Sequence, residues 1–302
     1  MNEEPETIPA AQPAVKRVPI WSIGIYAGET PFDLKPVGGI ENPVICAKDV
    51  SDIRADFVAD PFMVEAAGTW HMFFEVMNAG TKKGEIGLAT SEDRLTWHYR
   101  QIVLREPFHL SYPCVVHWEG EYYMTPETHE ANSIMLYRAD RFPDKWSLVG
   151  RIIDGAWTDP SVFFFDGLCW MFTSRASRQN DTLCLFHAET IEGPWRGHRM
   201  NPVIDGDSRI ARPGGRVVID GGRVFRFAQD CSIGYGDQVR ALEVSELTRL
   251  TYGEREIDQS PVLSPGQQAW HRSGMHHMDP HQVNGTWLAC VDGRRFNVLS
   301  SS

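Results

Sequence analysis

One short phrase returns five times along this chain of 302 residues. Each copy has a polar residue, a proline, a short apolar run, a turn that contains Gly and a second apolar run. The repeat prolines are separated by 52, 47, 53 and 67 residues, and they are Pro61, Pro113, Pro160, Pro213 and Pro280. This spacing suits a four-stranded propeller blade, although it is somewhat longer than the common repeat lengths. The sequence therefore predicts an all-β fold, a five-bladed β-propeller.

The remaining strands of each blade can also be identified. After each of the first four copies the chain continues with a third and a fourth strand pattern, usually around a tryptophan. Alternation of apolar and polar residues, rich in Val, Ile, Phe, Tyr and Trp, favours strands there. No such pattern follows the fifth copy, but WSIGIYAG at 21–28 is similar to GEIGLATS at 84–91, and NPVI occurs at both 42–45 and 201–204. We therefore predict that the segment near 20–46 supplies the outer strands of the last blade and closes the ring.

Composition sets the domain limits and excludes some partners. Residues 1–17 are acidic and rich in proline, and we expect a disordered tail there, followed by a single propeller domain over 18–302. No apolar run is long enough to span a bilayer or to act as a signal peptide. The net charge of −11 argues against general binding of nucleic acid. We expect a carbohydrate substrate and neither nucleic acid nor a membrane span.

The cysteines and histidines do not define a metal site. The six cysteines show no ligand spacing such as CxxC, and without a secretory signal we expect free thiols in a reducing, cytoplasmic compartment. Residues 271–281 hold four of the eleven histidines. They could bind a divalent ion near Asp279, bind substrate or a hydrated cation on the axis, or simply bond to the backbone. The prediction is that no cofactor and no metal is used.

Polar residues at the strand ends mark a candidate site. In an antiparallel blade, the start of the first strand and the end of the second lie on the same face. The residues that precede the repeat prolines should therefore surround one mouth of the axis: Asp60, Tyr112, Asp159, Arg212 and Asp279. The second strands should add Glu75, Glu127, Arg175, Asp230, Asp292 and Arg294. Like charges that close raise one another's pKa, which gives the carboxylic acid and carboxylate that glycosidic cleavage needs. Alternatively, each Asp-Pro caps a turn, and each glutamate pairs with an arginine at the rim.

With these motifs the chain resembles the five-bladed β-propeller glycoside hydrolases, namely the family 43 arabinanases and xylosidases, the invertases and the levansucrases. The resemblance covers nearly the whole chain after residue 18, and VADPFMV and TDPSVFF are similar to the blade-one and blade-three motifs of that group. It implies that Asp60 is the general base or nucleophile and that Asp159 orients substrate and tunes the pKa of the acid. His277 then lies near an axial histidine that many such enzymes place beside a bound cation.

One position departs from this group. Its general acid is a glutamate in blade four, where this chain has Ala211-Arg212-Pro213. An arginine cannot donate that proton, because its pKa stays above about 12. Either Glu127 or Glu75 has become the acid, or the chain is not a conventional glycosidase. The chain resembles still more closely the N-terminal propeller domain of plant glucosamine inositolphosphorylceramide transferases and bacterial relatives, through ADPFMV, the acidic ends of FFE and TPE, and TDPSVFF. In that setting the propeller accompanies a sugar-transferring domain.

The sequence favours a glycoside hydrolase-like, carbohydrate-active enzyme that cleaves or transfers a glycosyl unit, with Asp60, Asp159 and Glu127 as catalytic residues. The arginines at the strand ends indicate an anionic or phosphorylated sugar, unless they only balance the aspartates. The other residues expected to bind substrate are Glu75, Tyr112, Arg175, Arg212, Asp230, His277, Asp279 and Arg294. A non-catalytic sugar-binding module that partners a glycosyltransferase is the alternative, and a lyase, cyclase or isomerase is a third hypothesis.

Overall fold

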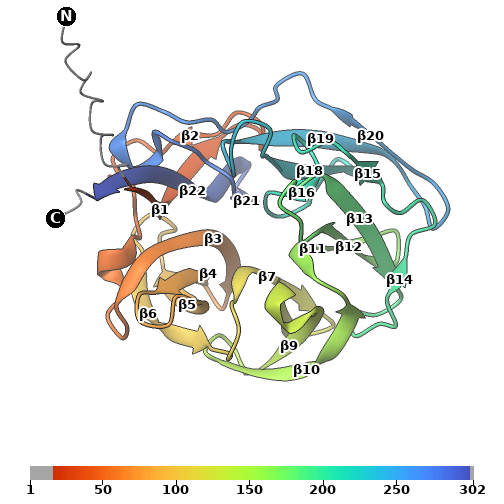
Figure 1. Cartoon of the computed structure of the whole chain (residues 1–302), viewed down its shortest axis with the longest axis horizontal. Coiled ribbons are helices and arrows are strands. Elements are labelled where there is room, and N and C mark those ends of the chain that lie inside the picture. Colours follow the sequence, from red (N-terminus) through yellow and green to blue (C-terminus); the bar gives the residue numbers. More distant parts are fainter. Residues whose placement is uncertain (1–15, 300–302) are drawn as a thin grey trace, which may run out of the picture.

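The computed structural model describes residues 16–299 and has five antiparallel sheets arranged around a central axis (Figure 1). The predicted five-bladed β-propeller is therefore confirmed. Short 3-10 turns are the other regular elements of the described chain: η1 (Ala47–Asp49), η2 (His129–Ala131) and η3 (Ala269–His271). No helix in this part of the chain is long and apolar enough to cross a membrane.

Blades one and two each consist of four consecutive strands. Blade one contains β3 (Ala55–Ala66), β4 (Thr69–Asn78), β5 (Gly84–Ser91) and β6 (His98–Leu104). Blade two contains β7 (Ser111–Trp118), β8 (Glu121–Glu127), β9 (Ser133–Arg141) and β10 (Lys145–Asp154). In both blades the strand that carries the repeat proline is at one edge of the sheet, and the sequence order continues outward from it.

Blades three and four are more irregular because short strands replace some of the long ones. Blade three contains β11 (Trp157–Phe165), β12 (Leu168–Arg175), β13 (Thr182–Ala188), β14 (Arg196–Gly197) and β15 (Ile204–Asp205). Blade four contains β16 (Arg212–Pro213), β17 (Val218–Asp220), β18 (Arg223–Asp230), β19 (Gln238–Leu247) and β20 (Tyr252–Glu256). In blade four the first strand is split, because residues 214–217 leave the sheet between β16 and β17.

Blade five joins the two ends of the chain, as predicted. It contains β21 (Met278–Val283), β22 (Thr286–Leu299), β1 (Lys16–Gly28) and β2 (Lys35–Pro36). Strand β1 pairs with β22 along its whole length, from Lys16 opposite Leu299 to Gly28 opposite Trp287. A bridge between Ile23 and Ile45 adds the NPVI segment to this blade. The expected tail falls mostly on residues 1–15, which lie outside the described residues, and β1 already begins at Lys16.

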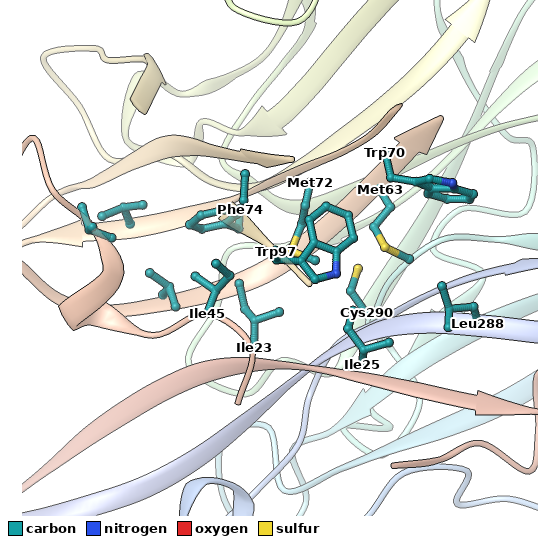
Figure 2. Packing of buried hydrophobic residues seen from close by; sticks show 14 residues of the cluster. Ile23, Ile25, Ile45, Met63, Trp70, Met72, Phe74, Trp97, Leu288 and Cys290 are labelled. Carbon is teal, nitrogen blue, oxygen red and sulfur yellow. The ribbon is translucent and has the colours of Figure 1, made fainter. Parts of the chain in front are cut away.

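The hydrophobic core lies within and between neighbouring blades. One cluster joins β1 and β22 of blade five to blade one, and Figure 2 shows Ile23, Ile25, Met63, Trp70, Met72, Phe74, Leu288 and Cys290 packed together. Ile23 and Ile25 are fully buried, and burial of one such side chain stabilises the fold by about 1.5–3 kcal/mol. All six cysteines are free thiols. The closing strand thus contributes core side chains as well as backbone hydrogen bonds.

Candidate functional site

The same backbone distortion occurs before the repeat proline in blades one, two and three. Asp60, Tyr112 and Asp159 have φ angles of 53°, 47° and 52°, in the left-handed region. In each blade two residues of the first strand oppose one residue of the second, which is a β-bulge. Aspartate tolerates this region, whereas it is uncommon for a bulky residue such as tyrosine. The bulge turns each pre-proline side chain away from the regular pleat and toward the axis.

Blades four and five lack this bulge, which changes where their pre-proline residues lie. Arg212 and Asp279 pair in regular register with Gln229 and Cys290. Arg212 still reaches the acidic group at the mouth, but Asp279 does not. Asp279 accepts a hydrogen bond from the Met63 N–H at 2.5 Å and forms ion pairs with Arg216 and His281. The expected convergence of all the pre-proline residues therefore does not extend to Asp279.

A layer of aromatic rings lies between these two polar groups. The rings of Phe62, Tyr112 and His277 contact one another edge to face, with centroids 4.7–5.1 Å apart. The Tyr112 hydroxyl lies 2.7 Å from Ser161 Oγ and also donates to the Gly215 carbonyl at 3.0 Å. Tyr112 and His277 are fully buried, as is Asp279. We predicted that Tyr112, His277 and Asp279 bind substrate, but in this structure they are part of the packed interior around the axis.

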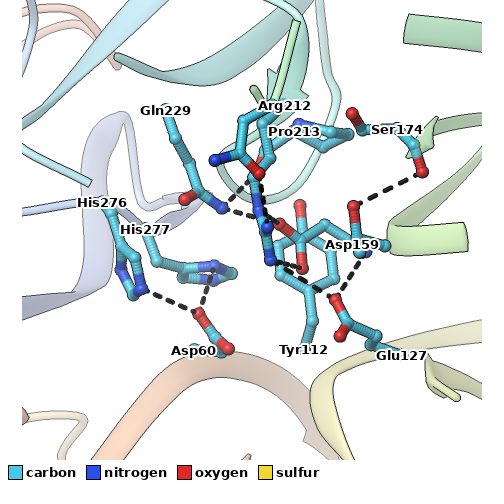
Figure 3. Close-up of polar contacts among 12 residues, drawn as sticks. Asp60, Tyr112, Glu127, Asp159, Ser174, Arg212, Pro213, Gln229, His276 and His277 are labelled. Atoms are coloured by element: carbon cyan, nitrogen blue, oxygen red, sulfur yellow. Dashed lines mark hydrogen bonds and ion pairs between the residues drawn. The ribbon is translucent and has the colours of Figure 1, made fainter. Parts of the chain in front are cut away.

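The guanidinium of Arg212 binds two acidic side chains from neighbouring blades (Figure 3). Its Nε lies 2.6 Å from Asp159 Oδ2, and its Nη2 lies 3.4 Å from Glu127 Oε2. Asp159 also accepts a hydrogen bond from Gln229 Nε2 at 2.7 Å, and its own backbone N–H donates to Glu127 at 3.2 Å. Burial raises the pKa of Asp159, the nearby Arg212 opposes that rise, and Glu127 adds to it. Blades two, three and four are thus joined by one buried ion-pair network.

Glu127 is held as a carboxylate. Besides Arg212, it contacts His129 Nδ1 at 2.7 Å. Burial raises its pKa, but the hydrogen bond from His129 and the charge of Arg212 outweigh that effect and lower the pKa to about 2. A group with this pKa carries no proton to donate near neutral pH. The geometry therefore disfavours our sequence-based choice of Glu127 as the acid.

Glu75 has the opposite environment. It is 5% exposed, and its Oε1 has no hydrogen-bond partner among the described residues. The nearest basic group is His109 Nε2, 3.6 Å from that oxygen. Burial, followed by the charges of Asp60 and Glu127, raises the pKa of Glu75 well above its usual value. Glu75 is the carboxyl group of this site that is best suited to remain protonated.

Asp60 faces two imidazole rings. Its Oδ1 lies 3.7 Å from His276 Nε2 and 3.9 Å from His277 Nδ1. Its backbone N–H donates to Asp292 Oδ2 at 3.1 Å. Burial raises the pKa of Asp60 to about 6, with His276 opposing the rise and Asp292 adding to it. Asp60 therefore changes charge close to neutral pH.

Asp60, His276 and Asp292 are also close enough to suggest a metal site, with candidate ligand atoms within 4.8 Å of one another. Their hydrogen bonds argue otherwise. Asp292 accepts from the backbone N–H groups of His276 and His277 and contacts His276 Nδ1 at 2.8 Å. Within these three residues, the Asp60 carboxyl group and His276 Nε2 are the atoms that such hydrogen bonds leave free. Asp292 and His276 are hydrogen-bonded, and the Asp60 carboxyl group faces His276 Nε2 at 3.7 Å.

Three residues that we predicted to bind substrate lie away from the acidic group at the mouth. Arg175 is exposed and lies over the Trp157 ring at 5.5 Å, and Asp230 is paired with Arg240 at 2.7 Å. Arg294 binds the Tyr235 carbonyl and pairs with Asp237 at 2.8 Å, so it holds the loop 231–237 in place. None of the three contacts the acidic group described above.

The loop 231–237 partly covers the mouth and contributes an aromatic ring that the sequence did not reveal. Tyr235 lies 5.0 Å from the Arg212 guanidinium and is 42% exposed. Gln229 and His129 were also missed, because neither occupies the expected position in the repeat. His276 was one of four histidines in a segment whose role was left open, and no local pattern distinguishes it.

A family model described as glucosamine inositolphosphorylceramide transferase 1, N-terminal, matches residues 17–294 of this chain. Glucosamine inositolphosphorylceramide transferase 1 of Oryza sativa subsp. japonica is 36% identical over 297 residues, which cover 91% of this chain and 40% of that protein. The Arabidopsis thaliana protein of the same name is 34% identical, with coverage of 91% and 39%. The chain therefore spans about 40% of the length of the curated relatives it matches.

Solved structures share the fold at low sequence identity. A thermostable family-43 glycoside hydrolase matches with a TM-score of 0.60 and 16% identity, over 84% of this chain and 90% of that one. A family 117 glycoside hydrolase of the marine bacterium Zobellia galactanivorans matches with a TM-score of 0.54 and 14% identity, over 90% of each chain. At these identities the similarity establishes the fold alone.

Proposed function

Because this chain belongs to the family of the N-terminal domain of glucosamine inositolphosphorylceramide transferase 1, we propose that its propeller mouth is a carbohydrate site. The reaction proposed is cleavage or transfer of a glycosyl unit. Two findings support it: the relatives are named for a sugar transfer, and the structural neighbours are glycoside hydrolases. The propeller accounts for only part of those relatives, so the role of this domain is argued from its own site.

The observation that carries the proposal is the contrast between Asp60 and Glu75. Both are buried in blade one, close to the other acidic groups, and neither is paired with an arginine or lysine. Cleavage of a glycosidic bond needs a carboxylate that attacks carbon or activates water, and a carboxylic acid that protonates the leaving oxygen. The charge of His276 opposes the rise in the pKa of Asp60, whereas the charges of Asp60 and Glu127 add to the rise in the pKa of Glu75, so Asp60 is the proposed base or nucleophile. Glu75 is the proposed acid.

The blade-four position supports this division of roles. Arg212 occupies the place where the resembling hydrolases carry their acid. Its charge lowers the pKa of Glu127 and opposes the rise that burial causes in the pKa of Asp159. Glu127 is then a fixed acceptor that orients a substrate hydroxyl, and its negative charge favours the protonated form of Glu75, as the neighbour of a general acid should.

The charge of the mouth favours a sugar that carries an amino group. Five carboxyl groups lie close together at the mouth, those of Asp60, Glu75, Glu127, Asp159 and Asp292, and the guanidinium that pairs with members of this group is that of Arg212. The other arginines on which we based an anionic ligand, Arg175 and Arg294, make contacts elsewhere. A protonated amine would reduce the repulsion among these carboxyl groups, whereas a phosphate would increase it. Glucosamine, which the names of the relatives contain, is the probe we choose.

One observation favours the alternative, a non-catalytic sugar-binding module that partners a glycosyltransferase. Glu127 and Asp159 are fully engaged with Arg212, as expected of a rigid recognition surface. In this reading Asp60 and Glu75 bind hydroxyl or amino groups and transfer no proton. The two readings differ in whether removal of a single carboxylate stops a reaction.

The deciding experiment compares wild type with Asp60→Asn on a panel of aryl and lipid-linked glucosaminides, with product detection by mass spectrometry. Asn keeps the size of the side chain but removes the basic oxygen, so turnover should fall at least about a hundredfold while the fold is retained. Asp56→Asn, on the same strand and partly exposed beside Lys82, is the matched control. Sugar binding without turnover in wild type would establish the module instead.

The same panel separates the candidate acids. Glu75→Gln should slow turnover most for substrates with poor leaving groups, because only those need the proton. Glu127→Gln should affect good and poor leaving groups equally, since a permanently ionised group donates no proton. The reverse pattern would identify Glu127, in blade two, as the acid.

A further inference from the structure

We propose that His276 is a positioning residue for Asp60: Asp292 fixes the imidazole so that its Nε2 faces Asp60 Oδ1 at 3.7 Å and can take up the proton that Asp60 accepts. This inference rests on the proposed function for its catalytic meaning, because it makes His276 the group that sets the charge of the proposed base. The arrangement is built by contacts among β3, β22 and the segment that precedes β21, with Trp21 of β1 and the loop 231–237 packed against the His276 ring.

The tautomer of His276 follows from the hydrogen bonds of Asp292. Asp292 Oδ1 accepts from the backbone N–H groups of His276 and His277 at 3.2 and 3.1 Å. The same oxygen lies 2.8 Å from His276 Nδ1, and a carboxylate can only accept, so Nδ1 carries the hydrogen. In the neutral ring the lone pair is then on Nε2, the nitrogen that faces Asp60 Oδ1 at 3.7 Å.

The plane of the His276 ring is fixed by packing from two further segments. Trp21 of the closing strand β1 stacks on the ring with centroids 3.8 Å apart and an interplanar angle of 15°. On the loop 231–237, the Tyr235 ring contacts it edge to face at 5.4 Å. Gly236 comes so close that a Cβ there would lie 2.6 Å from the Cβ of His276. His276 as a whole residue is 2% exposed, so its ring has little room to rotate.

The neighbouring His277 cannot serve the same purpose. Its Nε2 lies 2.9 Å from the Pro61 carbonyl, an acceptor, so Nε2 carries the hydrogen and Nδ1 is bare. Burial lowers the pKa of His277 to about 4, which leaves it neutral at physiological pH. Its Nδ1 has no hydrogen-bond partner among the described residues and lies 3.9 Å from Asp60. The Nδ1 of His277 can therefore act as a hydrogen-bond acceptor, and His276 is the ring that can take up the proton from Asp60.

The proton then has a defined place in the proposed reaction. When Asp60 takes a proton from the attacking water, that proton can pass to His276 Nε2 while the Nδ1 hydrogen stays on the ring, donated to Asp292. The imidazolium that results lies between two carboxylates, which stabilise it. A nucleophilic Asp60 would instead be kept ionised by the same imidazolium. The charged and titratable groups that face Asp60 from the surrounding elements are Glu75, Glu127, Asp159, Arg212, Tyr235, His276, His277 and Asp292.

The test is an NMR pH titration of the full chain, with ¹³C-carboxyl aspartate and ¹⁵N-imidazole histidine labels, in the absence of substrate. In wild type, the neutral form of His276 should be the Nδ1–H tautomer. In His276→Gln the pKa of Asp60 should rise by at least about one unit, because a cation that favours the carboxylate is lost. The wild-type tautomer needs no variant and remains informative if His276→Gln fails to fold.

His281→Gln is the matched control, since His281 also pairs with a buried aspartate, Asp279, but lies in the other polar group. It should leave the titration of Asp60 unchanged. An Nε2–H tautomer in wild type, an Asp60 titration unaffected by His276→Gln, or a spectrum that changes on adding EDTA would overturn the inference. None of these results depends on turnover, so the inference can fail while the proposed function stands, and the reverse is also true. If a substrate is found, the acidic limb of the kcat/KM profile should shift with the pKa of Asp60 in His276→Gln.

Discussion

Arg212 Nε lies 2.6 Å from Asp159 Oδ2, and this contact joins the pre-proline residues of blades four and three. The second partner of Arg212 is Glu127, which comes from blade two at 3.4 Å. One side chain thus bridges three blades and helps to lower the pKa of Glu127.

Replacing Arg212 should be costly. Arg212→Met leaves two buried carboxylates without their cation, and breaking a buried pair in this way costs about 3–5 kcal/mol of unfolding free energy. Urea denaturation followed by tryptophan fluorescence measures the loss. Arg209→Met is the control, because Arg209 pairs with Asp207 at the surface and should cost less than about 1 kcal/mol. Equal effects of the two variants would contradict the buried network.

The raised pKa of Glu75 predicts how stability depends on pH. The folded chain keeps the Glu75 proton to a higher pH than the unfolded chain, whose value is near 4.5. The folded state therefore binds more protons in that interval, and unfolding free energy falls as pH rises above about 4.5. Glu75→Gln should flatten this decline between pH 5 and 8 in urea titrations. Glu92→Gln, at an exposed position after β5, should keep the wild-type slope. A variant curve parallel to wild type would contradict a protonated Glu75.

The acidic mouth predicts a preference among sugars. Glucosamine should bind at least about tenfold more tightly at pH 7 than N-acetylglucosamine, in which the amine is neutralised, and glucose 6-phosphate should bind worst. Isothermal titration calorimetry gives the order of affinities. Measurements in two buffers of different ionisation enthalpy should also show proton release, because a bound cation lowers the pKa of Glu75. The strongest binding by the phosphate would support an anionic ligand instead.

Closure of the ring by β1 predicts a sharp limit to truncation. A chain that begins at Lys16 keeps every described strand pair, and its thermal unfolding should match that of the full chain. A chain that begins at Glu29 loses β1, exposes the edge of β22 and removes Ile23, Ile25 and the Trp21 ring that stacks on His276. It should be insoluble or unfolded by circular dichroism. A folded, monomeric product would show that blade five is stable without β1.

The repeat was sufficient to predict the blades. Each copy carries its own alternation of apolar residues and its own turn, so strand positions follow from local sequence. The missing outer strands of blade five could also be located, because WSIGIYAG repeats a third-strand pattern. The pre-proline position predicted that Asp60 and Asp159 lie near one another at the mouth, and both have the same left-handed backbone conformation there.

The protonation states could be decided only by the tertiary structure. Glu75 and Glu127 occupy equivalent strand ends, yet one lacks a cationic partner other than a nearby histidine and the other binds Arg212 and His129. Asp279 shares the proline motif of Asp60, but its carboxylate pairs with Arg216 and His281 instead of joining the acidic group at the mouth. Except for His129, the residues that make these differences are far apart in sequence from the groups they act on, and the pKa of a buried group depends on which residues the fold brings within a few ångströms.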